Sequence, residues 1–167
     1  MGVSAGARAL REDGYRFVTA APTTAADYDQ QQHVNNAAVV RLLNDLRIAY
    51  VNARLVPRFV EHLRDTGRVH VARELHVLYE SEGLPDERFV GGARVVARHG
   101  RAGIMEERIV EETTGRPVAR AWLVQLLVED GHVVDYPDWY WDLVAAAEGG
   151  PVRVADAPVR RSWGPPS

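Results

Sequence analysis

Apolar residues recur at two different spacings along this chain, and the change of spacing separates a helical part from an extended part. From Asn36 to about Leu55 they recur three or four positions apart, which is the spacing of one face of an α-helix. Asn35 or Asn36 can cap the start of this helix, and Pro57 marks its far end. After Gly67 apolar and polar residues alternate, which is typical of strands. The pattern predicts one long helix followed by several strands.

Turn residues divide the rest of the chain into further elements. Short segments that contain Gly, Pro or Asp, such as 83–86 and 130–131, separate runs rich in β-forming residues. The expected elements are a first strand, the long helix, a short second helix, four long strands, a short strand and a closing helix, over residues 15–21, 36–55, 58–65, 69–79, 88–98, 104–112, 118–128, 133–134 and 137–147. The strand over 118–128 is apolar on both faces, so we expect it to be central.

These elements predict the fold class. Short connections favour antiparallel pairing, so the four long strands are expected to form a meander. The long helix must bury its apolar stripe on the concave face of that sheet. The sequence therefore predicts an α+β fold, with an antiparallel sheet around one long central helix, in a domain over 13–148. Residues 1–12, small and polar, and 149–167, rich in Gly, Pro, Ala and Arg, are expected to be a flexible arm and a mobile tail.

The composition excludes several classes of protein. The 167 residues include 20 basic and 23 acidic ones, and the net charge of −3 argues against a nucleic-acid partner. No apolar run approaches the ~18 residues of a membrane-spanning helix. The absence of cysteine excludes disulfides, thiolate nucleophiles and cysteine-based zinc sites. Because the N-terminus lacks a secretory pattern and the histidines are scattered, we expect a cytoplasmic protein with neither a metal nor another cofactor.

One polar segment just before the long helix combines carboxylates, an imidazole and amides. It contains Asp29, His33, Asn35 and Asn36, whereas Asp27 is expected to be solvated. The first turn of a helix carries unpaired N–H groups and the positive end of the helix dipole, which can polarise a carbonyl and hold an oxyanion. A nearby carboxylate can act as a base or nucleophile. The segment could serve an ester or thioester hydrolase, and the alternative interpretation is a plain capping loop.

The same residues resemble a known signature. Asp29, followed after three residues by His33-Val34-Asn35-Asn36 and then by an amphipathic helix, is similar to hotdog-fold acyl-CoA thioesterases of the 4-hydroxybenzoyl-CoA thioesterase type. Acyl-ACP thioesterases carry a similar His-Val-Asn-Asn. The resemblance covers roughly residues 15–147.

The resemblance implies a hotdog fold and a thioester hydrolase. The carboxylate of Asp29 would attack the thioester carbonyl or activate water, and the backbone N–H of Asn36 would polarise that carbonyl. His33 and Asn35 would orient the carboxylate, the water or the loop. The substrate would be an acyl-CoA or an acyl-carrier protein, and the site would lie between subunits of a homodimer or homotetramer. Which arginines would contact the CoA phosphates stays open.

Three positions depart from the family pattern. Gln32 stands where the family usually has Gly, Val39 replaces a common aromatic residue, and Asn44 replaces a common Glu. Since some branches use that helix carboxylate in catalysis, Asn44 shifts the expected chemistry to Asp29. Two alternatives stay open: a non-catalytic acyl-CoA-binding module, and a hydratase or dehydratase of enoyl thioesters, which also pairs a carboxylate with a histidine.

Overall fold

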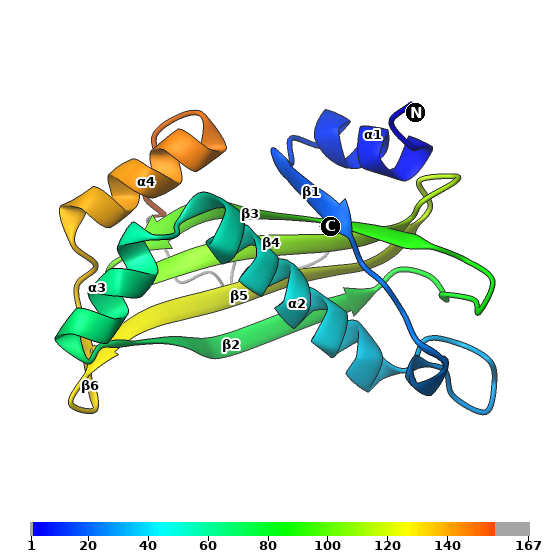
Figure 1. Ribbon diagram of the computed structural model, residues 1–167, viewed down its shortest axis with the longest axis horizontal. Helices are drawn as coiled ribbons and strands as arrows, with labels where there is room; N and C mark the ends of the chain where they lie inside the picture. The colour runs from blue at the N-terminus through cyan, green and yellow to red at the C-terminus, as the bar shows by residue number, and fades with distance from the viewer. Residues whose placement is uncertain (1, 156–167) are drawn as a thin grey trace. The chain divides into compact units, whose positions relative to one another are not determined.

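The computed structural model describes residues 2–155, and the predicted helices and strands occur in it in the expected order (Figure 1). The elements are α1 (Ala5–Glu12), β1 (Phe17–Ala20), the 3-10 turn η1 (Ala25–Asp27), α2 (Asn36–Arg54), α3 (Arg58–Thr66), β2 (Val69–Tyr79), β3 (Phe89–His99), β4 (Ala102–Glu111), β5 (Pro117–Glu129), β6 (His132–Val134) and α4 (Asp138–Glu148). The long helix and the long strands begin and end within about two residues of their predicted bounds.

The strands form one sheet in the order β1-β3-β4-β5-β2, and β6 pairs with β5. Phe17 of β1 lies opposite Ala93 of β3 in an antiparallel register. The expected meander is correct for β3, β4 and β5 but wrong for β2, which lies beside β5. Residues 80–88 are long enough to cross the three strand spacings between β2 and β3, each about 4.8 Å. An antiparallel sheet with one long helix confirms the predicted α+β class.

The chain divides into two compact units, each of which takes parts of the long strands. The first contains residues 2–53, His76–Arg94 and Glu106–Trp122, and the second contains Arg54–Leu75, Val95–Met105 and 123–155.

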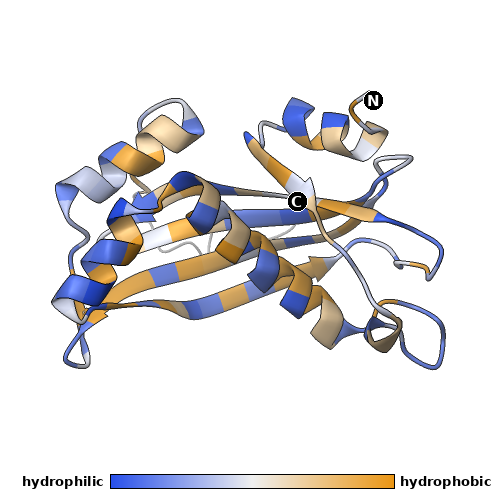
Figure 2. Cartoon of the chain, in the orientation of Figure 1, coloured by the Kyte–Doolittle hydropathy of each residue, from blue (hydrophilic) through white to orange (hydrophobic). Residues whose placement is uncertain are grey.

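In the first unit, α2 buries an apolar stripe against the strands. Leu42, Leu43 and Leu46 are at most 2% exposed and pack with Phe89 and Ile109. Burial of each such side chain contributes about 1.5–3 kcal/mol, so this stripe holds the helix. A Cβ on Gly91 of β3 would collide with the side chain of Leu46, so glycine allows the helix to approach the strand closely. Figure 2 shows apolar residues alternating with polar ones along α2.

The expectation of a flexible arm over residues 1–12 is wrong, because this segment contains α1. Ser4 caps that helix by accepting a hydrogen bond from the N–H of Ala7. Leu10 is fully buried beside Tyr15 and Val110. The helix has only eight residues, and its buried positions are Gly6 and Leu10, one turn apart, so the pattern is too short to stand out in the sequence.

The second unit has an aromatic core. Phe59 of α3 and Tyr140 of α4 are at most 1% exposed, and their ring centroids lie 4.7 Å apart. His70 of β2 lies edge-on to Phe59, and Tyr136 stacks on Tyr140. This cluster joins both helices of the unit to β2.

The expectation of a mobile tail from residue 149 is wrong for its first part. The N–H of Arg98 in β3 donates to the carbonyl of Arg153, and the N–H of Ala155 donates to the carbonyl of Arg98, each at 2.8 Å. Val154 thereby forms a parallel bridge with Arg98. Residues 156–167 of the predicted tail lie outside the described residues. Within residues 2–155, no helix is both long and apolar enough to cross a membrane.

Candidate active site

The segment before α2 folds into a tight loop. Tyr28 and Val34 form an antiparallel bridge, the N–H of Asp29 donates to the carbonyl of His33 at 2.9 Å, and the N–H of Gln32 donates to the carbonyl of Asp29 at 3.0 Å. Gln32 closes the turn with a φ of +62°, in the left-handed region that favours glycine. The resembling family usually has Gly here, and the turn gives the physical reason.

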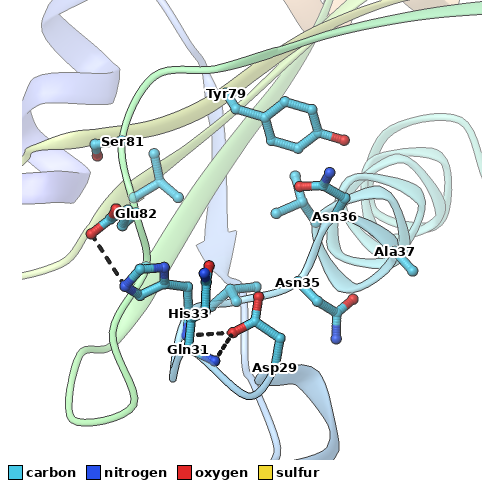
Figure 3. Close-up of a pocket in the computed structure, with 13 residues that line it drawn as sticks. Asp29, Gln31, His33, Asn35, Asn36, Ala37, Tyr79, Ser81 and Glu82 are labelled. Carbon is cyan, nitrogen blue, oxygen red and sulfur yellow. Dashed lines mark hydrogen bonds and ion pairs between the residues drawn. The ribbon is translucent and has the colours of Figure 1, made fainter.

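The carboxylate of Asp29 is exposed and held by the loop's own backbone. Its Oδ1 accepts the N–H of Gln31 at 2.8 Å and the N–H of His33 at 3.1 Å. No partner of its Oδ2 is found among residues 2–155. Two hydrogen bonds to Oδ1 fix the direction of the carboxylate and leave the other oxygen open to solvent or substrate (Figure 3).

Asn35 caps α2, and its side chain is occupied in doing so. Its Oδ1 accepts the N–H of Ala38 at 2.8 Å, and its Nδ2 donates to the carbonyl of Asp27 at 2.9 Å. The N–H groups of Asn36 and Ala37, in the first turn, have no acceptor within the helix. The cap therefore occupies the side chain of Asn35, whereas the N–H of Asn36 has no partner within the helix.

A cavity of about 640 Å³ in the first unit brings these groups together. Asp29, His33 and the start of α2 at Asn36 line one side, and the end of β2 with the following connection lines the other. Figure 3 shows the carboxylate of Asp29 and the first turn of α2 beside the same space. All four candidate residues therefore line one cavity, and among them the side chain of Asn35 is used in capping.

The ring of His33 does not face Asp29. Its peptide N–H contacts the carboxylate, whereas its Nε2 lies 3.3 Å from Oε2 of Glu82 (Figure 3). The structure thus brings the backbone of His33, and not its imidazole, to Asp29.

The expectation that Asp27 is solvated is wrong. This residue is 7% exposed, and both oxygens of its carboxylate accept hydrogen bonds. Its Oδ2 accepts the N–H of Thr24 at 2.6 Å and the Nη2 of Arg41 at 2.9 Å. Burial alone would raise the pKa of Asp27, but the Thr24 amide and the Arg41 guanidinium outweigh it and lower that pKa. Arg41 lies one turn into α2, so Asp27 fastens the loop to the helix.

Sequence reasoning missed the residues that come from the sheet. Tyr79 ends β2 and lies with its ring toward Asn36 in Figure 3, and Ser81 and Glu82 follow it along the cavity wall. Their position depends on β2 lying beside β5, which no local pattern indicates. Asn44 does not line this cavity and accepts a hydrogen bond from Arg47.

The described residues contain no gathering of three or more His, Asp or Glu side chains suited to a metal ion. The lining of the cavity includes amides, the imidazole of His33 and the carboxylates of Asp29 and Glu82.

The order of the sheet and the helix whose first turn opens on a cavity define a hotdog-fold protein. A family model described as the thioesterase-like superfamily matches residues 23–145, which is most of the chain. The chain belongs to this superfamily, as the resemblance in its loop predicted. No curated protein sequence matches it.

Solved structures share the fold. A thioesterase from Thermus thermophilus, complexed with coenzyme A and Zn, is 23% identical, with a TM-score of 0.72 over 84% of this chain and 99% of that one. A hypothetical protein from Staphylococcus aureus, in complex with CoA, is 11% identical, with a TM-score of 0.72 over 90% of this chain and 94% of that one. YbaW, a probable thioesterase from Escherichia coli, is 16% identical, with a TM-score of 0.66 over 75% of this chain and 94% of that one.

Proposed function

We propose that this protein hydrolyses an acyl thioester to a free acid and a thiol, with Asp29 as general base or nucleophile. The observation that carries the proposal is that the open carboxylate oxygen of Asp29 and the first amides of α2 border the same cavity. Membership of the thioesterase-like superfamily supports the reaction class.

In the general-base route, Asp29 takes a proton from water as the water oxygen bonds to the carbonyl carbon. The carbonyl oxygen becomes an oxyanion, which the N–H of Asn36 at the start of α2 would stabilise. The tetrahedral intermediate then expels the thiolate, and the proton held by Asp29 passes to the thiolate or to solvent. In the nucleophilic route, Asp29 bonds to the carbon itself and the tetrahedral intermediate expels the thiolate, which takes a proton from solvent. Water then hydrolyses the resulting mixed anhydride to the free acid and restores Asp29.

The proposed substrate is an acyl-CoA or an acyl-carrier-protein thioester. Two of the similar solved structures are complexes with coenzyme A, which supports the first carrier. Cavity-lining Val39 and Val118 would offer apolar contact to an acyl group.

We also propose that the protein works as a homodimer or homotetramer. Val40 and Ile48 of α2 are 37% and 49% exposed, and Tyr79, at the cavity, is 51% exposed. A second subunit would cover these side chains and narrow the open side of the cavity. A cytoplasmic location stays a prediction.

The experiment is release of free thiol from a panel of acyl-CoA substrates by the wild type, by Asp29→Asn and by Asp86→Asn. Asparagine keeps an oxygen for the Gln31 and His33 amides but removes the base, so we expect kcat/KM to fall by at least ~100-fold. Asp86 is an exposed carboxylate of the β2–β3 connection, and its variant is expected to keep wild-type activity.

An unchanged rate in Asp29→Asn would remove Asp29 from the mechanism. Binding of acyl-CoA without thiol release by the wild type would instead favour the acyl-binding module. Addition of water to an enoyl-CoA with the thioester left intact would favour a hydratase.

A further inference from the structure

The imidazole of His33 has a second carboxylate as its partner. Its ring is directed to Glu82, in the connection between β2 and β3, with Nε2 and Oε2 3.3 Å apart (Figure 3). Among residues 2–155, the structure shows no polar partner for Nδ1. Glu82 is separated from the signature segment by 46 residues of sequence, and the sequence pattern did not single it out.

Hydrogen bonds from Arg116 and Val34 hold the backbone around Glu82 in place. Arg116, just before β5, donates from Nη1 to the carbonyl of Glu82 at 2.6 Å. Its Nη2 donates to both carboxylate oxygens of Glu87, at 2.5 and 2.7 Å. The N–H of Val34 donates to the carbonyl of Gly83 at 2.9 Å, and this bond joins the β2–β3 connection to the loop of Asp29. The backbone position of Glu82 beside the loop of His33 is therefore set by several hydrogen bonds.

The pair itself contributes little to stability. The side chains of His33 and Glu82 are 30% and 69% exposed, and an exposed ion pair typically contributes about 0–1 kcal/mol. It can nevertheless set the state of the ring. An imidazole whose Nε2–H donates to a carboxylate carries its lone pair on Nδ1, and such a partner fixes both tautomer and ring direction.

We propose that Glu82 is a positioning residue for His33. It keeps the proton on Nε2, so that His33 meets water or substrate in the cavity through Nδ1, as a hydrogen-bond acceptor. The inference rests on the proposed function for its effect on rate, but its effect on the ring can be observed without turnover.

The rate test is a double-mutant cycle on thiol release from acyl-CoA. If Glu82 acts through His33, Glu82→Ala lowers kcat/KM about 10-fold in the wild type and has no further effect in His33→Ala. Glu82→Gln, whose side-chain oxygen can still accept the Nε2–H, keeps most of the activity. Asp86→Ala, which removes the same charge from the same connection, leaves kcat/KM unchanged. Equal losses in both backgrounds, or an equal loss in Asp86→Ala, would overturn the proposal.

The second test observes the ring nitrogens of His33 by ¹⁵N NMR in the substrate-free protein at about pH 8, where an ordinary imidazole is neutral. The wild type is expected to show one protonated nitrogen, Nε2, and Glu82→Ala a mixture of the two tautomers. Identical spectra would overturn the proposal. If the wild type releases no thiol but shows this difference, hydrolysis fails while the positioning of His33 by Glu82 stands.

Discussion

Asp27 and Asp29 are two residues apart in one loop, yet the structure uses them in opposite ways. Asp27 is buried, and the Thr24 amide and the Arg41 guanidinium occupy its oxygens. Asp29 is exposed, and its loop holds one oxygen and leaves the other open. A carboxylate whose oxygens are all occupied can fasten a loop but cannot take a proton from water. The partners, and not the residue type, therefore separate an aspartate that fastens the loop from one that keeps an oxygen open.

The same contrast occurs between adjacent residues of β4. Glu106 accepts hydrogen bonds from Tyr15, Arg94 and Arg120, and although burial alone would raise its pKa, these partners lower it. Glu107 is 1% exposed, and its Oε1 has no hydrogen-bond partner within the described residues. Burial raises the pKa of Glu107 to about 8, against the opposing charge of Arg47. Burial favours the neutral acid wherever partners do not hold the charge.

The largest expected effect is on the pH dependence of stability at Glu107. The folded state holds this proton up to about pH 8, while an unfolded glutamate loses it near its ordinary pKa of 4.5. The contribution of Glu107 to the free energy of unfolding is thus fully present below about pH 4.5. It is lost as the pH rises toward 8, which lowers that free energy by at most roughly 5 kcal/mol. Glu107→Gln removes this loss of stability at higher pH. Urea unfolding of the variant and the wild type at several pH values measures the difference. Parallel curves for the two proteins would contradict the neutral state of Glu107.

Next in size is the effect of Asp29→Asn, which extends the activity test to stability. A 100-fold loss of kcat/KM corresponds to about 2.7 kcal/mol of transition-state stabilisation. The free energy of unfolding is expected to change by less than about 0.5 kcal/mol, because the asparagine oxygen can still accept both loop amides. Chemical denaturation measures this, and a large destabilisation would place Asp29 in the same class as Asp27.

Asp27→Asn is expected to show the reverse. Its neutral amide group cannot form an ion pair with Arg41, and we expect a loss of about 2 kcal/mol of stability. This value is lower than for a fully buried ion pair because the side chain of Arg41 is 42% exposed. Asp45→Asn is the matched control, since Asp45 pairs with the same Arg41 at its exposed side and should contribute less than about 0.5 kcal/mol. Equal losses of stability in the two variants would show that the burial of Asp27 does not strengthen its ion pair with Arg41.

The smallest expected effect is at Asn35, which joins the two aspartates' loop to α2. Asn35→Ala removes the cap on Ala38 and the bond to the Asp27 carbonyl, at a cost of about 1 kcal/mol. Asn35→Asp keeps the capping oxygen and should be less destabilised. Thiol release by Asn35→Ala should fall only a few fold, and a 100-fold loss with unchanged stability would make Asn35 a catalytic residue.

Local pattern was sufficient for much of the fold. The limits of α2, a cap at Asn35 or Asn36, and the four long strands follow from spacing and turn residues, because each depends on neighbours a few positions away. The structure selects Asn35 as the cap. The helix α1 was missed because its eight residues bury only Gly6 and Leu10, which is too short a pattern to recognise. The signature residues Asp29, His33 and Asn36 could be proposed for a similar reason, since they lie within one short loop and helix start. Their roles stay a prediction.

The tertiary structure decided which partners the side chains of this loop have. The pairing of Asp27 with Arg41, and of His33 with Glu82, joins residues that are distant in sequence, as does the place of β2 beside β5. Such contacts depend on the order of strands in the sheet and on which side chains are buried next to each other. The spacing of residues along the chain indicates neither. The sequence by itself determined the helix, the strands and the polar loop. The sheet order and the partners in space decided that Asp27 fastens the loop and that Asp29 is left open.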